Sequence, residues 1–307
     1  MEKFSKSLKL MGNIFTITVV SEDAIFAEEN IQLAIQEIQR IEALFTTYNN
    51  ESQTNLINSN AGIEPVKVDE EVFNLIQRSL HISKITQGAF DISYGSIDKS
   101  LWNFDKTMTS LPSSETAKKM VHLINYNNII LDSQKQTIYL KEKGMRIGFG
   151  GIGKGYAAEM AKRILVKNQV KSGIINASGD LTAWGFQPNG KPWTIGIANP
   201  DMPNDAFSYL EISDKAIATS GNYEKFITID GKKYSHTIDP KTGLPITGIK
   251  SVTVISNNAE FADAMATPIA VMGIEKGLFL VNQLPNLHCI VIDENNKIYT
   301  SKNIHLK

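Results

Sequence analysis

Apolar residues along the chain follow two different periods, one typical of strands and one typical of helices. Residues 14–20 alternate between apolar and polar side chains, which predicts a half-buried strand. Residues 22–45 carry isoleucine, alanine and leucine at helical spacing, and residues 70–86 predict a second helix. The polar stretch 48–60 between these two helices predicts a loop.

The rest of the chain is richer in short apolar segments with the spacing of strands. Strands are predicted at residues 128–131, 137–140, 172–177, 193–198, 207–212, 216–218, 225–229, 252–256, 288–293 and 297–300. Helices are predicted at residues 156–167, 259–272 and 276–283. Because strands and helices do not alternate regularly, the pattern predicts an α+β fold. No linker rich in proline, glycine or serine divides the chain into separate domains.

The composition is that of a globular protein, with 42% hydrophobic and 21% charged residues, which excludes a disordered or collagen-like chain. Lysine and arginine number 31 against 32 aspartate and glutamate, so the formal net charge is −1. Because no basic excess exists to neutralise phosphates, nucleic acid is not expected as a partner. The single cysteine, Cys289, permits no internal disulfide. No apolar run reaches the length of a transmembrane helix.

A glycine-rich run at residues 148–155 precedes a predicted helix and contains Lys154. Closely spaced glycines let backbone amides approach an anion, and the start of a helix adds a positive partial charge. The alternative is a turn that only lets a strand and a helix pack closely. A second candidate, Asn176–Asp180, follows an apolar strand, where small residues can open a ligand crevice. For this segment alone an ordinary turn is the preferred interpretation.

Two further candidates lie nearer the C-terminus. His236 is flanked by hydroxyl residues and followed three residues later by Asp239, which makes it a candidate for catalysis. A lone histidine is more often a hydrogen-bonded structural residue, however, and Asp239 also suits a turn. Asp263 and Thr267 are spaced four residues apart on a predicted helix and therefore share a face. Such a pair can hold a hard divalent cation or simply hydrogen-bond inside the protein, and the second interpretation is preferred for this motif in isolation.

These segments occur in one order, and together they resemble the ApbE family of FAD:protein FMN transferases. The matching stretches are 148–155, 178–180, 218–223, 234–243 and 262–267, with weaker matches at Met11-Gly12, Tyr48–Asn58, Gly88–Asp91 and Leu101-Trp102. The resemblance implies one ApbE-like unit over residues 1–307, built from two intimately packed α+β lobes with mixed or antiparallel sheets. Three positions depart from the family pattern: Gly148 replaces an acid, Gln53 stands where glutamate is frequent, and Gly153 replaces an alanine.

The resemblance implies an enzyme that transfers the FMN part of FAD to a threonine hydroxyl of an acceptor protein, such as a flavin-bearing redox subunit, and releases AMP. It assigns a Mg²⁺ site, with Mn²⁺ as an alternative, to Asp263, Thr267 and the carbonyl of Gly153. It assigns the general base to His236, with Asp239 orienting it, and no role to position 148. The FAD-binding residues that it implies are Met11, Tyr48, Trp102, Lys154, Ser178, Gly179, Asp180, Thr219 and Ser220.

Two other functions share these motifs. A Mg²⁺-dependent FAD pyrophosphatase would use water in place of threonine and give free FMN and AMP. A non-catalytic flavin-binding protein would hold FAD without releasing AMP. The resemblance also implies a lipoprotein on the periplasmic side of the inner membrane in the full-length form. A cytoplasmic location is the alternative, because this sequence contains no signal segment or anchor cysteine.

Overall fold

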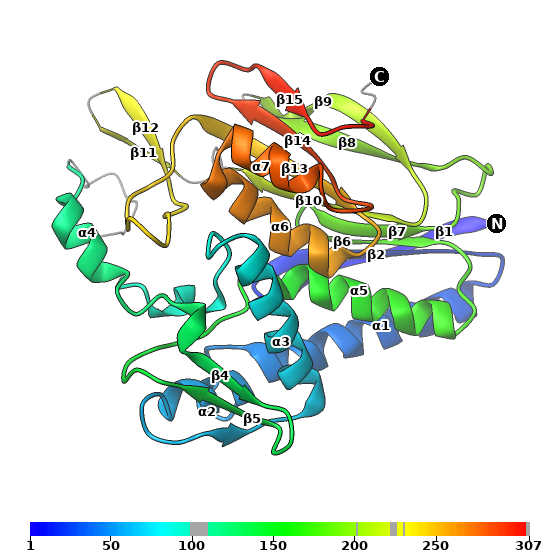
Figure 1. Ribbon diagram of the computed structural model, residues 1–307. Coiled ribbons are helices and arrows are strands. Elements are labelled where there is room, and N and C mark those ends of the chain that lie inside the picture. The colour runs from blue at the N-terminus through cyan, green and yellow to red at the C-terminus, as the bar shows by residue number, and fades with distance from the viewer. Residues whose placement is uncertain (99–109, 201, 222–225, 230, 305–307) are drawn as a thin grey trace.

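The computed structural model describes residues 1–98, 110–200, 202–221, 226–229 and 231–304 (Figure 1). Its largest element is an eight-stranded sheet in the order β1-β2-β6-β7-β10-β13-β14-β15, in which all neighbouring strands are antiparallel. The strands are β1 (Glu2–Leu10), β2 (Asn13–Ser21), β6 (Gly173–Ala177), β7 (Asp180–Trp184), β10 (Lys215–Gly221), β13 (Ile249–Ser256), β14 (His288–Asp293) and β15 (Ile298–Thr300).

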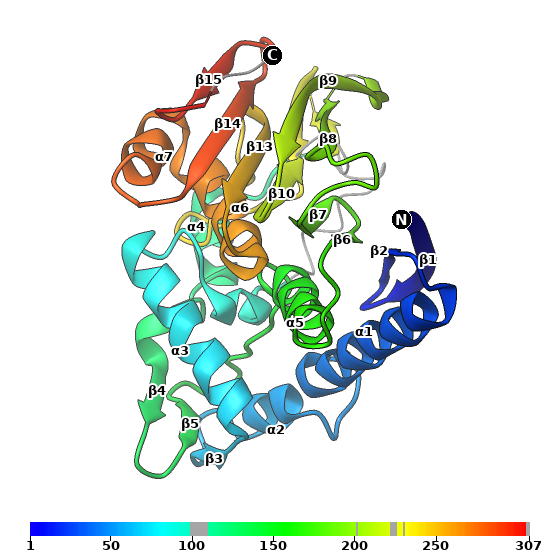
Figure 2. The ribbon, with the colours of Figure 1, turned by 90° about the vertical axis from the view of Figure 1, so that its right-hand side faces the viewer.

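One face of this sheet is covered by helices, which lie side by side beneath it in Figure 2. They are α1 (Ala24–Phe45), α5 (Gly153–Lys167), α6 (Ala259–Met272) and α7 (Ile274–Val281). Helix α1 begins where the Asp23 carboxylate accepts hydrogen bonds from the amides of Ile25 and Phe26. Its apolar stripe, which includes Ile31 and Ile38, is buried. Among the described residues, no helix is long and apolar enough to cross a membrane.

The opposite face of the sheet is covered by a two-stranded hairpin, β8 (Trp193–Asn199) and β9 (Met202–Ile212). Trp193 and Ile212 pack there in one cluster with Ile217 of β10. The neighbouring Ala218 of β10 instead belongs to the core on the helical side. Successive side chains of a strand point to opposite faces of a sheet. Strand β10 therefore contributes side chains to the hydrophobic clusters on both faces.

A smaller region lies on the far side of the helical layer (Figure 1). It contains α2 (Gln53–Ser59), α3 (Glu70–Ile85), α4 (Ser114–Met120), the 3₁₀ turns η1 (Ile92–Ser96) and η3 (Tyr126–Asn128), and the sheet β3 (Val66–Lys67), β5 (Thr137–Leu140) and β4 (Ile129–Asp132). The hairpin of β11 (Phe226–Ile229) and β12 (Lys232–Ser235) lies apart from it, at the upper left of Figure 1. Ile76 of α3 and Ile138 of β5 belong to the same hydrophobic core as Ile17 of β2. The two regions therefore share one large hydrophobic core, while Met120 of α4 belongs to a separate small cluster with Ile97, Val121 and Ile238.

The predicted α+β class is confirmed, and the sheets are antiparallel. The prediction of a loop over residues 48–60 was wrong in part, because α2 occupies residues 53–59. Ser52 begins this helix by accepting a hydrogen bond from the amide of Asn55 at 3.1 Å, a local cap that the polar composition concealed. The pattern also gave no sign of β1, in which Phe4 and Leu8 are partly buried between exposed polar residues.

Candidate active site at the start of helix α5

Helix α5 begins directly after the glycine-rich run, at Gly153. Ile152, at its N-cap, offers no capping side chain, and the amide of Gly155 instead donates a hydrogen bond to Asp263 Oδ2 of α6 at 2.8 Å. A Cβ on Gly155 would lie 2.6 Å from the Cβ of Asp263 and would also collide with the carbonyl of Ala259. Glycine is therefore required at 155 for the close approach of α5 and α6.

The preceding part of the glycine run is less crowded. A Cβ on Gly150 would meet no heavy atom of the described residues within 4 Å, and one on Gly148 would meet only the Thr47 side chain, at 3.9 Å. The close-packing interpretation therefore applies to Gly155, whereas the loop before the helix has space beside its backbone.

The side chain of Lys154 forms an ion pair with Asp180, the first residue of β7. Lys154 Nζ lies 2.5 Å from Asp180 Oδ2, and Asp180 Oδ1 accepts a hydrogen bond from the amide of Thr219 at 3.2 Å. The Asp180 side chain is only 5% exposed and that of Lys154 27%. This pair therefore fixes the position of the Lys154 ammonium group.

Asp263 lies beside this ion pair in a buried position. Burial, and next the nearby charge of Asp180, raise the pKa of its carboxyl from 3.8 to about 7, while Lys154 and the Gly155 amide act in the opposite direction. Gly155 is the only hydrogen-bond donor to Asp263 among the described residues, so Asp263 Oδ1 keeps its acceptor capacity. A cation or a proton at this carboxylate would remove the cost of its burial.

The hydroxyl of Thr267 lies one helical turn beyond Asp263 and donates to Ser220 Oγ of β10 at 3.4 Å. The neighbouring Thr219 points to the other face of the sheet, where its hydroxyl lies 3.0 Å from that of Thr253. The structure therefore brings Ser220 together with Thr267 and separates the side chain of Thr219 from them.

The oxygen atoms near Asp263 are of the kinds that bind small hard cations. They comprise the Asp263 carboxylate and the hydroxyls of Thr267 and Ser220, with Gly153 at the start of the adjacent helix. Within the described residues, no three His, Cys, Asp or Glu side chains gather to hold a metal ion. A cation here would need hydroxyl, carbonyl, phosphate or water oxygens to complete its coordination.

Two tight turns lie at the same end of the sheet. Met11 and Gly12 join β1 to β2 with φ angles of 51° and 74°, and Ser178 and Gly179 join β6 to β7 with φ angles of 52° and 100°. Ser178 binds the backbone of β2, since its amide donates to the carbonyl of Ile14 at 3.0 Å. A Cβ on Gly153 would lie 3.5 Å from the Met11 methyl carbon, so the first turn adjoins the start of α5.

His236 lies in an exposed position directly after β12. Asp239 accepts hydrogen bonds at both carboxylate oxygens from its own loop, from the amide of Lys241 at 2.9 Å and the hydroxyl of Thr242 at 3.1 Å. This is the geometry of a turn residue. The assignment of His236 as base and of Asp239 as its orienting group stays a prediction.

The structure describes only one of the two aromatic residues that are predicted to bind FAD. Tyr48 follows α1 and is 99% exposed. The preceding Thr47 adjoins Gly148, which places this loop beside the glycine run. Trp102 lies outside the described residues.

A model of the ApbE family matches residues 11–291 of the chain. The chain belongs to the ApbE family. A FAD:protein FMN transferase of Klebsiella pneumoniae is 32% identical over 300 residues, which span 97% of this chain and 92% of that protein. The predicted family and transferase class are thereby confirmed.

Solved ApbE structures share the fold over nearly the whole chain. The crystal structure of the ApbE protein of Thermotoga maritima superposes with a TM-score of 0.87 at 29% identity and covers 98% of this chain and 97% of its own. The apo flavinyl transferase ApbE of Pseudomonas stutzeri gives a TM-score of 0.85 at 26% identity, with 98% and 95% covered.

Sequence reasoning missed two buried acids of this ApbE chain. Glu159 of α5 accepts a hydrogen bond from the amide of Ala259 at 3.0 Å, and Glu260 of α6 binds Arg78 of α3 at 2.6 and 3.0 Å. Both acids are 6% exposed. The spacing of Glu159 four residues after Gly155 was a visible signal, because it puts both on one helix face.

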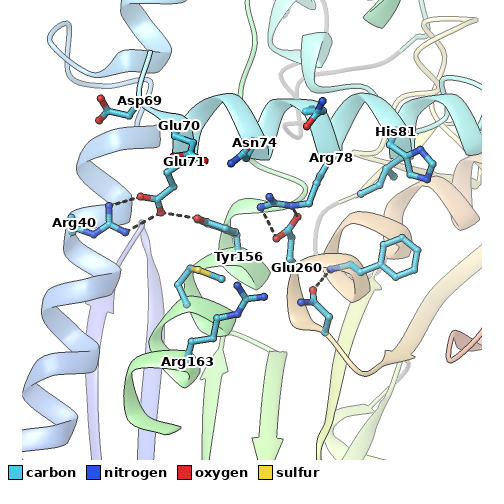
Figure 3. A pocket seen from close by; sticks show the side chains of 15 residues that line it. Arg40, Asp69, Glu70, Glu71, Asn74, Arg78, His81, Tyr156, Arg163 and Glu260 are labelled. Atoms are coloured by element: carbon cyan, nitrogen blue, oxygen red, sulfur yellow. Dashed lines mark hydrogen bonds and ion pairs between the residues drawn. The ribbon is translucent and has the colours of Figure 1, made fainter. Parts of the chain in front are cut away.

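A cavity of about 990 Å³ lies between α3 and helices α1, α5 and α6 (Figure 3). None of the predicted site residues lines it. Its charged groups are largely paired with one another: Arg40 binds Glu71, which also accepts from the Tyr156 hydroxyl at 2.6 Å, and Arg78 binds Glu260. These pairs connect α3 to the helical layer that carries the candidate site.

Proposed function

We propose that this ApbE-family chain transfers the FMN part of FAD to a threonine hydroxyl of an acceptor protein and releases AMP. The observation that carries the proposal is the group formed by Lys154, Asp180 and Asp263 beside the start of α5. The likeness over nearly the full length to a relative named FAD:protein FMN transferase supports it.

The proposed reaction is a substitution at one phosphorus of the FAD diphosphate. The threonine oxygen forms a bond to the phosphorus of the FMN half, the bond from that phosphorus to the bridging oxygen breaks, and AMP leaves with the bridging oxygen. The threonine proton passes to a base. Negative charge spreads over the phosphate oxygens during the substitution, so positive groups fixed beside them lower the barrier.

Lys154 is proposed to supply one such charge, together with backbone amides of the glycine run. Asp263, Thr267 and the carbonyl of Gly153 are proposed to bind Mg²⁺ or Mn²⁺, which would neutralise diphosphate charge when bound. Burial of Asp263 and its open Oδ1 position support this assignment. Asp180 holds Lys154 in place.

His236 is proposed to accept the threonine proton, because an exposed imidazole can meet an acceptor protein and histidine is the side chain that most often acts as a general base. Asp239 then acts by fixing the loop that follows His236, through its bonds to Lys241 and Thr242. The remaining FAD contacts are proposed at Met11, Tyr48, Trp102, Ser178, Gly179, Thr219 and Ser220.

Intact-protein mass spectrometry tests this proposal. A threonine-containing acceptor domain from a redox subunit is incubated with the chain, FAD and Mg²⁺, beside a threonine-to-alanine acceptor and a reaction without metal. The expected result is one FMN phosphodiester on the first acceptor and none on either control. AMP with free FMN and no adduct would indicate a pyrophosphatase, and retained FAD without AMP would indicate a binding protein.

We also propose that residues 1–307 act as one domain, which the shared core supports. Limited proteolysis would contradict this if it released a stable folded half. From the family resemblance we further propose that the full-length protein acts on the periplasmic side of the inner membrane as a lipoprotein. Cell fractionation tests this, and recovery in the cytoplasm would contradict it.

A further inference from the structure

Helices α5 and α6 cap each other where they cross. The amide of Gly155, in the first turn of α5, donates to the carboxylate of Asp263 at 2.8 Å. The amide of Ala259, the first residue of α6, donates to Glu159 Oε2 at 3.0 Å. First-turn amides have no acceptor within their own helix, so each helix relies here on a carboxylate of the other.

The bond from Ala259 to Glu159 is buried, and Glu159 is the acceptor for that amide in the described residues. The N-cap Asn258 accepts from Phe261 instead, at 2.9 Å. Arg163 Nε lies 3.9 Å from Glu159 Oε1, but its side chain is 63% exposed, so this ion pair adds little. Loss of the Glu159 carboxylate would leave a buried N–H without a partner, which favours movement of the α6 start.

The two caps are geometrically connected. Ala259 and Asp263 are four residues apart on α6, and Gly155 and Glu159 are four residues apart on α5, so each pair lies along the contacting face. Because Gly155 has no side chain, the helices touch at their backbones. Rotation of α6 at Ala259 would therefore move the Asp263 carboxylate away from the Gly155 amide and the Lys154–Asp180 pair.

We propose that Glu159 is a positioning residue for Asp263. By holding the Ala259 amide, it fixes the rotation of α6 and so the place where the Asp263 carboxylate meets a divalent cation. The role in cation binding rests on the proposed function, whereas the coupling between the two caps does not.

The first test measures amide hydrogen exchange without metal. In Glu159→Met, which has similar length but no acceptor, the Gly155 amide should exchange about tenfold faster relative to a central-sheet amide such as that of Val254. Glu159→Gln keeps an acceptor oxygen and should retain the wild-type ratio. Leu165→Ala destabilises α5 away from the crossing and should accelerate both amides equally. An unchanged Gly155 ratio in Glu159→Met would overturn the proposal.

The second test titrates Mg²⁺ alone and follows the thermal midpoint. Substitution of a residue that orients a metal ligand lowers the affinity for the metal about 10–100-fold. Glu159→Met should therefore need at least about tenfold more Mg²⁺ than the wild type to reach half of the maximal stabilisation. Glu159→Gln and Leu165→Ala should titrate as wild type. The positioning role would be overturned if Leu165→Ala needed as much additional Mg²⁺ as Glu159→Met does. It would also be overturned if Glu159→Gln needed more Mg²⁺ than the wild type. Absence of any Mg²⁺ effect on wild type would refute the metal assignment, while hydrogen exchange decides the coupling independently.

Discussion

Raising the pH of the metal-free protein from about 6 to about 8 should destabilise it through Asp263. The pKa of this carboxyl is raised from 3.8 to about 7, first by burial and then by the charge of Asp180. The folded protein thus binds the proton more tightly than the unfolded chain does. The contribution of this proton to the free energy of unfolding is fully present below the pKa of Asp263 in the unfolded chain. It is lost as the pH rises through about 7, the pKa in the folded protein.

The size of the effect follows from proton linkage between these two pKa values. Each unit of difference corresponds to about 1.4 kcal/mol, and the interval from pH 6 to pH 8 covers only part of the titration. The expected decrease in the free energy of unfolding over this interval is about 1 kcal/mol.

Urea titrations at both pH values, in the presence of a chelator, measure this decrease. Asp263→Asn is the matched control, because its amide oxygen can still accept from Gly155 while the side chain no longer ionises. The pH dependence of the wild type minus that of Asp263→Asn isolates the contribution of this one carboxyl from all other titrating groups.

Mg²⁺ should reverse the effect, because the cation binds the ionised carboxylate and stabilises the folded state by mass action. Its stabilisation should be larger at pH 8 than at pH 6 in the wild type and small in Asp263→Asn. Equal pH dependence of the wild type and Asp263→Asn would refute the buried-carboxylate reasoning. A Mg²⁺ effect of equal size in Asp263→Asn would refute the metal assignment.

Three further substitutions test separate parts of the site. Gly155→Ala should lose about 1–3 kcal/mol of unfolding free energy, since the added methyl would overlap α6, and wild-type stability in denaturant titration would contradict this. His236→Ala should slow FMN transfer about 10²–10⁴-fold while FAD binding persists in fluorescence titration, and an unchanged rate would exclude His236 as the base. Lys154→Met should be less stable than the double variant Lys154→Met/Asp180→Asn, because it leaves a buried carboxylate unpaired, and calorimetry showing equal stability would contradict that account.

The sequence allowed the longer helices and many strands to be predicted because their apolar residues keep a regular period, whereas the short helices α2 and α4 were not predicted. Helix α6 is an example: its predicted limits, residues 259–272, agree with the structure, and the i,i+4 spacing placed Asp263 and Thr267 on one face. Strand β1 could not be found in this way. It lies at the edge of the sheet, and its half-buried positions include Lys6 between Phe4 and Leu8, which interrupts the apolar alternation in the sequence.

The long-range partners of the site were beyond pattern reasoning. The ion pair of Lys154 with Asp180 joins a helix to a strand that are far apart in the sequence, so no local spacing encodes it. The hydrogen bond from the Ala259 amide to Glu159 likewise joins two helices that are far apart in the sequence, so no local spacing encodes it. By contrast, the separation of Thr219 from Ser220 follows from the alternation of a strand and was predictable once β10 was assigned.

The most direct test of FMN transfer compares AMP release with adduct formation in the same reaction. The chain is mixed with FAD, Mg²⁺ and an excess of acceptor domain, and chromatography of AMP is combined with the intact mass of the acceptor at successive times. FMN transfer predicts one AMP for each FMN attached throughout the reaction. AMP that accumulates without a matching adduct on any threonine-containing acceptor would contradict it.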